Sequence, residues 1–283
     1  MIKVEGLSHI YNCGLPDERY ALKDVNFEIR DKEFTAIIGH TGSGKSTLIQ
    51  HLNGLIKPHE GKIFINGIDI TQKGVDIRQI RQKVGLVFQY PEHQLFEETV
   101  YKDIAFGPKN LGLEDEEIKK RVLHACELVN IEEKLLEKSP FEISGGQKRR
   151  VAIAGVLSMQ PEILILDEPT AGLDPKGRDK LLSVLEKLKD ELTVVLVSHS
   201  MEDVARVAKN IIVMNKGTVY KQGSVAEIFA DCRGLEKIGL NIPQITQLIN
   251  RLNEFGAGLP QDIYTVGYAA QILKDRMGNR KNV

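Results

Sequence analysis

A glycine-rich segment between an apolar run and a helical pattern restricts the fold of this chain more than any other feature. The segment reads Gly39-His-Thr-Gly-Ser-Gly-Lys-Ser and matches the phosphate-loop pattern GxxxxGK(S/T). The run Phe34–Ile38 before it has the length of a strand, and Lys45–Leu55 after it has helical spacing. Glycines let the backbone turn so that its N–H groups and the helix N-terminus face phosphate oxygens. The order strand, loop, helix predicts a P-loop nucleotide-binding core.

The phosphate-loop pattern assigns contacts to individual residues. Lys45 is expected to bridge the β- and γ-phosphates, and the Ser46 hydroxyl is expected to bind Mg²⁺. The chain is therefore expected to use ATP and Mg²⁺. The predicted nucleotide-binding residues of this segment are Gly39, His40, Thr41, Gly42, Ser43, Gly44, Lys45, Ser46 and Thr47.

Two adjacent carboxylates follow the apolar run Ile163–Leu166. Open α/β sheets bind ligands at the carboxyl ends of their strands, so Asp167 and Glu168 are expected to face the phosphate loop. Asp167 would hold Mg²⁺, directly or through water. Glu168 would orient or deprotonate the attacking water, so the two neighbouring acids take different roles.

Short apolar runs and helical stripes alternate in the remainder of the core. The stripe Leu181, Leu182, Val184, Leu185 and Leu188 lies between the apolar runs Ile163–Leu166 and Thr193–Val197. This alternation predicts an α/β fold with a parallel sheet and helices on its faces. The runs Ile2–Glu5, Ala21–Ile29 and Lys62–Ile65 predict a small antiparallel sheet.

The middle and the end of the chain have a different pattern. Residues 114–138 are highly charged and helical in spacing, with Glu116/Lys120 and Glu117/Arg121 placed for helical pairing. We expect an ATP-binding core from residues 1–89 and 161–225, a helical insertion at 90–160 and a C-terminal extension at 226–283. In the extension, Ile242, Ile245, Leu248, Ile249 and Leu252 form an apolar stripe.

Composition limits the possible partners. The chain has 38 Lys and Arg against 39 Asp and Glu, a net charge of -1, so no global field favours nucleic acid. No signal peptide is expected, and the apolar runs are too short to span a bilayer, so a membrane role would be peripheral. The three cysteines lie far apart and suggest neither zinc nor a disulfide framework.

A second candidate anion site lies at Ser144-Gly-Gly-Gln147, before the helical pattern Lys148–Leu157. A serine and two glycines at a helix start form a cradle for an anion. One ATP does not need two such cradles. Ser144, Gly145, Gly146 and Gln147 are therefore expected to serve a nucleotide that another subunit holds.

These motifs together resemble the ATP-binding cassette (ABC) ATPases over about residues 2–225. The resemblance implies a P-loop NTPase (RecA-like) core with an antiparallel β-subdomain, an inserted helical subdomain and a C-terminal helical extension. It implies that Gln89 contacts Mg²⁺ and takes part in catalysis, that His199 contacts the γ-phosphate, and that Ala171–Asp174 forms the D-loop, where Asp174 contacts nucleotide. Tyr11 looks like the residue that stacks on adenine, with Tyr20 as the alternative. Ile143 stands where leucine is commoner.

Within this family, three segments resemble the energy-coupling factor (ECF) transporters, and the last of the three resembles the second of their two ATPases. They are Phe88–Val100, Ser139–Leu157 and Glu168–Gly177, and Gly239–Leu248 is similar to the family's C-terminal extension. The resemblance implies a heterodimer with a paralogous ATPase, a membrane coupling protein (T component) and a substrate-capture protein (S component). It implies import of vitamins or transition-metal ions, with this chain peripheral on the cytoplasmic side of the cell membrane.

Several alternatives remain at this point. The chain could serve another type of ABC importer, or it could be a soluble ABC ATPase acting on nucleic acid or ribosomes. The membrane partner is expected to insert a short helix at Gln89–Phe106, unless Leu95, Phe96 and Phe106 fill the insertion's own core. The apolar stripe of the tail could pack against the other ATPase or against its own domain.

Overall fold

A computed structural model describes residues 1–189 and 191–279. Its centre is a six-stranded sheet in the order β10-β9-β3-β8-β7-β6. The strands are β3 (Phe34–Ile38), β6 (Val84–Val87), β7 (Ile163–Asp167), β8 (Thr193–Val197), β9 (Asn210–Asn215) and β10 (Thr218–Ser224). All neighbouring strands run parallel except β10, which pairs antiparallel with β9. The predicted α/β class is confirmed.

Apolar side chains cover both faces of this sheet. In β7, Ile163 and Ile165 face one core cluster, whereas Leu164 and Leu166 face another. Every residue of β3, β7 and β8 is buried, which explains why the sequence shows continuous apolar runs instead of alternation.

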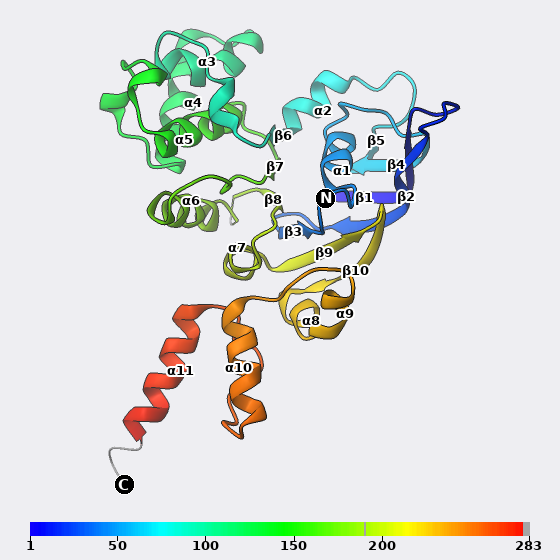
Figure 1. The fold of residues 1–283 in the computed structure, drawn as a ribbon. Coiled ribbons are helices and arrows are strands. Elements are labelled where there is room, and N and C mark those ends of the chain that lie inside the picture. Colours follow the sequence, from blue (N-terminus) through cyan, green and yellow to red (C-terminus); the bar gives the residue numbers. More distant parts are fainter. Residues whose placement is uncertain (190, 280–283) are drawn as a thin grey trace.

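A second, antiparallel sheet packs beside the first on the side of α1 (Lys45–Leu52) (Figure 1). Its strands are β1 (Ile2–Tyr11), β2 (Arg19–Ile29), β4 (Glu60–Ile65) and β5 (Ile68–Asp69), in the order β2-β1-β4-β5. This confirms the predicted sheet, although β1 and β2 are longer than expected. α1 ends three residues earlier than the predicted helix, because Asn53 caps it and Gly54 follows in a left-handed conformation.

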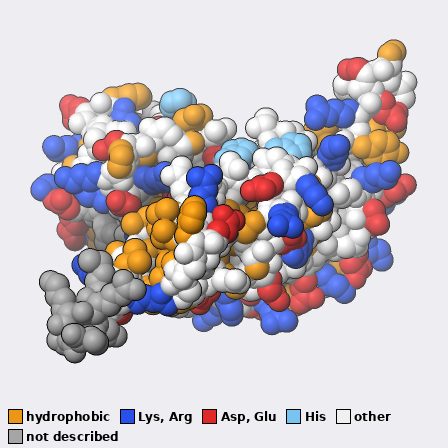
Figure 2. All heavy atoms as spheres, turned by 60° about the horizontal axis from the view of Figure 1, so that its bottom comes forward, with side chains coloured by type: hydrophobic (Ala, Val, Ile, Leu, Met, Phe, Trp, Pro, Cys, Tyr) orange, Lys and Arg blue, Asp and Glu red, His pale blue; other side chains and the backbone are white. Residues whose placement is uncertain are grey.

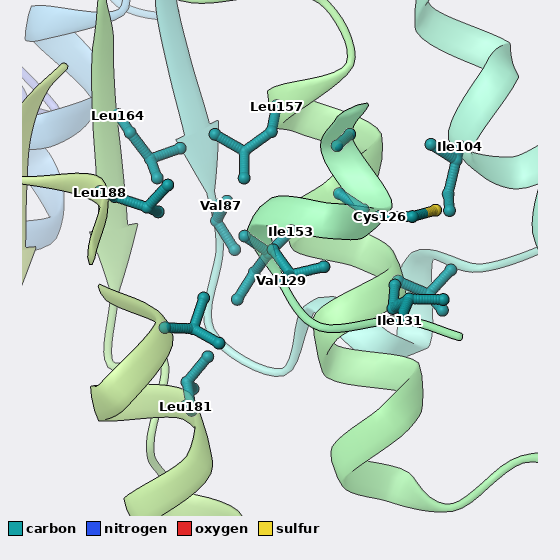
Figure 3. Close-up of a cluster of buried hydrophobic side chains, with 14 of the residues drawn as sticks. Val87, Ile104, Cys126, Val129, Ile131, Ile153, Leu157, Leu164, Leu181 and Leu188 are labelled. Carbon is teal, nitrogen blue, oxygen red and sulfur yellow. The ribbon is translucent and has the colours of Figure 1, made fainter. Parts of the chain in front are cut away.

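The opposite face of the six-stranded sheet meets the helical region at residues 90–160, which forms its own lobe in Figure 1. This region holds η1 (Pro91–Gln94), α3 (Val100–Asn110), α4 (Asp115–Leu128), η2 (Glu133–Leu135), η3 (Pro140–Glu142) and α5 (Gly145–Leu157); α2 (Ile77–Lys83) precedes it. Figure 3 shows Leu164 and Val87 of the sheet near Ile153 and Leu157 of α5. α6 (Pro175–Leu188) adds its predicted leucine stripe to this cluster.

The prediction of a continuous helix over residues 114–138 is wrong in its second half. α4 ends at Leu128, and Asn130 takes a left-handed conformation with φ 53°. The chain then reverses so that Ile131 and Leu135 enter the core, which a straight helix would not allow. Glu117 and Arg121 pair as expected at 2.7 Å.

α7 (Met201–Val207) precedes β9, and the C-terminal part of the chain begins after β10. It contains α8 (Val225–Phe229), α9 (Cys232–Lys237), α10 (Gln244–Glu254) and α11 (Val266–Asn279), and the last two project from the body (Figure 1). Within the described residues, no helix has both the length and the apolar character needed to cross a membrane.

Four of the five residues of the predicted stripe lie on α10, and three of these, Ile245, Ile249 and Leu252, pack in one cluster. Ile242 precedes α10 and packs against Ala36 and Ile38 of β3, because Pro243 delays the start of the helix. Ile249 packs in a small cluster of the tail itself with Leu259 and Ile263, whereas Leu248 is 51% exposed. Figure 2 shows hydrophobic side chains gathered on the side from which α10 and α11 project. Part of the stripe therefore packs against other residues of the same chain.

Candidate nucleotide-binding site

Four segments meet at the carboxyl ends of the parallel strands and enclose a cavity of about 350 Å³. They are the loop between β3 and α1 and the residues that follow β6, β7 and β8. The sequence prediction that these motifs converge agrees with this arrangement. The residues that line the cavity are Thr41, Gly42, Gly44, Lys45, Ser46, Thr47, Gln89, Asp167, Glu168 and His199.

The glycines of the loop are required by close packing. A Cβ atom at Gly39 would lie 2.4 Å from the Met214 carbonyl oxygen, and one at Gly44 would lie 2.6 Å from the Ala21 carbonyl oxygen. Gly44 also has φ +102°, which disfavours any other residue. The loop is thus fixed between β9 and β2, with its concave side open.

Three predicted residues of the loop support it from outside the cavity. Gly39 lies behind the loop, and Ser43 is fully buried. The His40 ring lies 3.1 Å from Oδ1 of Asn215, the last residue of β9, and 2.7 Å from the Thr41 carbonyl. These three residues shape the loop, and the cavity is lined by their neighbours.

Lys45 places its ammonium group at the base of the cavity. The side chain is buried, and Nζ donates to the carbonyl oxygens of Gly39 at 2.7 Å and His40 at 3.1 Å. Burial lowers the pKa of Lys45, and the nearby carboxylates Glu168 and Asp167 oppose this effect. A buried cation at a helix start, with the adjacent loop N–H groups, suits a polyphosphate.

Ser46 and Asp167 provide oxygen ligands beside Lys45. Burial raises the pKa of Asp167, whereas a hydrogen bond from Ser46 and the charge of Lys45 act in the opposite direction. Hydroxyl and carboxylate oxygens are the ligands that Mg²⁺ prefers, usually together with phosphate oxygens and water. The described residues contain no group of three or more His, Cys, Asp or Glu that could hold a metal alone. The donor set therefore fits Mg²⁺ bound jointly with a phosphate.

Glu168 has the most unusual environment in the cavity. It has φ +49°, a strained value for a residue with a side chain. Burial raises the pKa of its carboxyl to about 7. Its Oε2 accepts a hydrogen bond from the His199 backbone N–H at 3.3 Å, and Oε1 lies 3.2 Å from His199 Nε2. A carboxylate that binds a proton near neutral pH suits a general base.

His199 follows β8 and faces Glu168. Burial, followed by the charge of Lys45, lowers the pKa of His199, which favours the neutral ring. Gln89 enters the same cavity from the end of β6. The predicted catalytic residues Glu168, His199 and Gln89 thus lie together.

The two candidate tyrosines for adenine differ in position. The Tyr11 hydroxyl lies 3.2 Å from Thr47 Oγ1, at the start of α1, and the Tyr11 ring packs edge-on against His9. The ring remains 41% exposed. Tyr20 lies further along the hairpin, opposite Ile10. The geometry favours Tyr11 for stacking.

The Ser144–Gln147 segment is not part of this cavity. Ser144 caps α5: its Oγ accepts from the Gln147 N–H, and Gln147 Oε1 accepts from the Ser144 N–H at 2.9 Å. Cβ atoms at Gly145 and Gly146 would meet no atom within 4 Å, so this helix start is open to solvent. Asp174 likewise lies outside the cavity and caps α6 through the Gly177 N–H at 3.1 Å.

Sequence reasoning missed two buried charged residues near the site, Arg149 and Asp203. Arg149 of α5 is fully buried and pairs with Glu92 of η1. One signal was available: Arg149 precedes the buried residue Ile153 by four positions, which places it on the inner face of the helix.

Comparisons with known proteins agree with this geometry. The family model described as ABC transporter matches residues 22–171. The energy-coupling factor transporter ATP-binding protein EcfA2 of Caldanaerobacter subterraneus subsp. tengcongensis is 59% identical, covering 100% of this chain and 99% of the relative. The protein of the same name from Clostridium tetani is 56% identical, covering 99% of this chain and 98% of the relative.

Two solved structures have a similar fold. The structure of cbiO1 from Clostridium perfringens, part of the ABC transporter complex cbiONQ, has a TM-score of 0.75 and 42% identity, covering 88% of this chain and 98% of that one. The ATP-binding cassette MJ0796, in a dimeric post-hydrolysis state bound to ADP and Pi, has a TM-score of 0.70 and 33% identity, covering 80% of this chain and 99% of that one.

Proposed function

This chain belongs to the energy-coupling factor transporter ATP-binding proteins, within the ABC transporter family, and from that premise we propose that it hydrolyses ATP to drive an importer of vitamins or transition-metal ions. One observation carries the proposal. The phosphate loop, Asp167 and Glu168 share one cavity, and the Glu168 carboxyl there has a pKa of about 7. A binding module without turnover would not need a base tuned to neutral pH.

ATP is bound mainly through its phosphates and its base. The N–H groups of the loop and the Lys45 ammonium bind the β- and γ-phosphates. The exposed Tyr11 ring stacks on adenine, an interaction worth about 1–3 kcal/mol. The hydrogen bond between the Tyr11 and Thr47 hydroxyls aligns the ring with the start of α1.

Mg²⁺ fits beside the phosphates. Ser46, Asp167 and Gln89 would hold it, because these residues line the cavity from three different segments and carry oxygen ligands. When bound, the ion supplies positive charge that offsets the negative charge of the phosphates.

Glu168 accepts the proton of the attacking water. Its Oε1 is buried, lies 3.2 Å from His199 Nε2 and makes no hydrogen bond of good geometry within the described residues, so it can accept one from a water in the cavity. His199, whose lowered pKa favours the neutral ring, lies beside it, where Nε2 can contact the γ-phosphate once nucleotide is bound. Gln89 lines the same cavity from the end of β6 and is the third proposed catalytic residue.

Two chains are needed for a complete site. Ser144, Gly145, Gly146 and Gln147 form an open helix start outside their own cavity, and Asp174 lies outside it too. In a head-to-tail dimer these groups would contact the ATP that the opposing ATPase holds. The resemblance to the second ECF ATPase favours a paralogous ATPase as that partner.

A groove beside the helical region is the proposed contact with the membrane coupling protein (T component). It is a cavity of about 440 Å³ between η1, α3 and α5. Phe96 is 61% exposed and packs edge-on against Phe106, which is 43% exposed, whereas Leu95 packs against the core. The exposed rings support docking of a short apolar helix, and the T component would connect this chain to a substrate-capture protein (S component). The chain would then be peripheral on the cytoplasmic side of the cell membrane.

The proposed domain division follows from these roles. Residues 1–89 and 161–225 bind ATP, residues 90–160 present the Ser144 cradle and the docking groove, and residues 226–283 form an extension. The exposed side chains of α10 and α11 support a contact of this extension with the other ATPase.

The decisive experiment is Glu168→Gln in the purified transporter complex. The amide keeps the shape of the side chain but cannot accept a proton, so we expect turnover to fall roughly 10²–10⁴-fold while ATP-bound dimers accumulate. Glu162→Gln is the matched control. Glu162 lies just before the first residue of β7, at the end of the strand opposite Glu168, and pairs with Lys83 on the surface. Undiminished hydrolysis by the Glu168 variant would remove the proposed catalytic role.

A further inference from the structure

Arg149 has the largest side chain among the fully buried residues of the described chain. It lies on α5, in the second turn after the Ser144 cap. Burying a guanidinium is unfavourable unless every N–H group finds a partner and the charge is matched. The partners of Arg149 therefore indicate which parts of the molecule this residue holds together.

Its first partner is the carboxylate of Glu92. Arg149 Nε donates to Glu92 Oε2 at 2.9 Å, and Nη2 donates to Oε1, so the pair is bidentate. Glu92 belongs to η1, the short helix that follows Gln89 and leads into the docking groove at Gln94 and Phe96. A planar fork of this kind fixes orientation as well as distance.

Its second set of partners is the turn that begins at Glu168. Arg149 Nη1 donates to the carbonyl oxygens of Pro169 at 2.9 Å and Ala171 at 2.6 Å. The same turn is closed by a hydrogen bond from the Ala171 N–H to the Glu168 carbonyl at 3.1 Å. Because Glu168 has a strained backbone, its conformation depends on such surrounding contacts.

A third contact joins these two segments directly. The Arg149 guanidinium lies 5.8 Å from the centre of the Tyr90 ring, next to Gln89. The same ring lies against Gly172, where a Cβ atom would be 3.4 Å from Tyr90 Cε1. Arg149 thus sits where the residues after Gln89, the residues after Glu168 and the helix after Ser144 meet.

We propose that Arg149 is a positioning residue that couples the docking groove to the catalytic carboxylate. One guanidinium holds Glu92 on one side and the Pro169–Ala171 turn on the other, so a shift of η1 moves the turn and with it Glu168. The proposal rests on the proposed function, since it takes Glu168 as the base and the groove as the membrane contact. Arg149 contacts neither nucleotide nor water in this scheme.

The test uses Arg149→Lys in the purified transporter complex. Lysine keeps the charge but cannot bind the carboxylate and both carbonyl oxygens in the same planar arrangement. We expect kcat to fall roughly tenfold or more, because small displacements of a catalytic group have effects of that size. The KM for ATP should stay within about twofold, because the phosphate loop is untouched. A role in folding alone would lower the melting temperature without this split between kcat and KM.

Arg206→Lys is the matched control. Arg206 also makes several side-chain bonds, to Glu186, Asp179 and Ser183, but these join α7 to α6 and do not involve the site. Its variant should lose comparable contacts and keep kcat within about twofold of the wild type.

Glu92→Gln provides the second variant and decides the question if Arg149→Lys does not fold. It keeps the shape of the side chain and should lower kcat several-fold. The double variant should be no worse than Arg149→Lys alone, because both changes break one connection. The proposal is overturned if a folded Arg149→Lys variant keeps the wild-type kcat or changes only KM. It is also overturned if Glu92→Gln keeps the wild-type kcat, or if the losses of kcat in the two single variants multiply in the double variant. Activity in Glu168→Gln would instead reject the proposed function.

Discussion

The burial of Glu168 has a measurable cost that the Glu168→Gln variant should remove. Burial raises the pKa of this carboxyl from 4.5 to about 7. Each pH unit of pKa difference corresponds to about 1.4 kcal/mol, so the ionised side chain disfavours folding by about 3 kcal/mol at high pH. Its side chain is only 12% exposed, so solvent screens this cost little.

The sign of the effect follows from the two protonation states. Below pH 4.5 the carboxyl is neutral in both the folded and the unfolded chain, and the raised pKa carries no cost. Between pH 4.5 and about 7 the unfolded chain releases this proton while the folded chain keeps it, so the stability falls progressively and the loss is complete once the buried group ionises above about pH 7. Glutamine is neutral throughout. We therefore expect Glu168→Gln to be more stable than the wild type by about 1 kcal/mol at pH 5 and about 3 kcal/mol at pH 8.5.

Urea unfolding followed by circular dichroism, without nucleotide, measures this difference. The free energy of unfolding of both proteins is compared at pH 5 and pH 8.5, with Glu162→Gln, just before the opposite end of β7, as the control. The control removes a half-exposed surface pair with Lys83, so its stability should stay within about 1 kcal/mol of the wild type at both pH values. A difference of equal size at the two pH values, or a Glu168→Gln variant less stable at pH 8.5, would refute the reasoning.

Three further outcomes are expected. The same raised pKa should make kcat fall about tenfold between pH 8 and pH 6, because the fraction of ionised Glu168 falls by that factor; a flat pH–rate profile would contradict it. Lys45→Ala should abolish ATP binding in a nucleotide titration, because the phosphates lose their buried cation; near-normal affinity would argue against the assigned loop. Ser144→Arg should leave the ATP affinity of its own chain unchanged and block hydrolysis at the partner's phosphate loop; loss of its own ATP binding instead would mean that the site is complete in one chain.

The sequence predicts a segment well when its local pattern of apolar and polar residues matches the burial of those residues in the fold. The phosphate loop is one example, because its glycines, strand and helix are contiguous. The leucine stripe of α6 is another, since all five of its residues are buried as expected. The separate motifs at Gln89, Asp167 and His199 meet because parallel strands end at one edge of a sheet.

The predictions that fail depend on single residues that change the direction of the chain. Asn130 in a left-handed conformation ends the predicted helix, and Pro243 separates Ile242 from α10. Arg149 was missed for another reason. Its burial is stabilised by a carboxylate, carbonyl groups and an aromatic ring from distant segments, and no local pattern encodes those partners.

The position of β3 within the sheet has a consequence for synthesis of the chain. β3 carries the phosphate loop, yet both of its neighbours come late: Phe34 pairs with Val194 of β8, and Ala36 pairs with Ile211 of β9. At about 5–20 residues per second, a ribosome needs on the order of 10–30 s to make the intervening chain. During that interval the apolar strand has no sheet to join, whereas β1, β2 and β4 can already pair locally. The nascent chain thus exposes an unpaired strand edge, which makes this stage prone to aggregation and suited to protection by a chaperone.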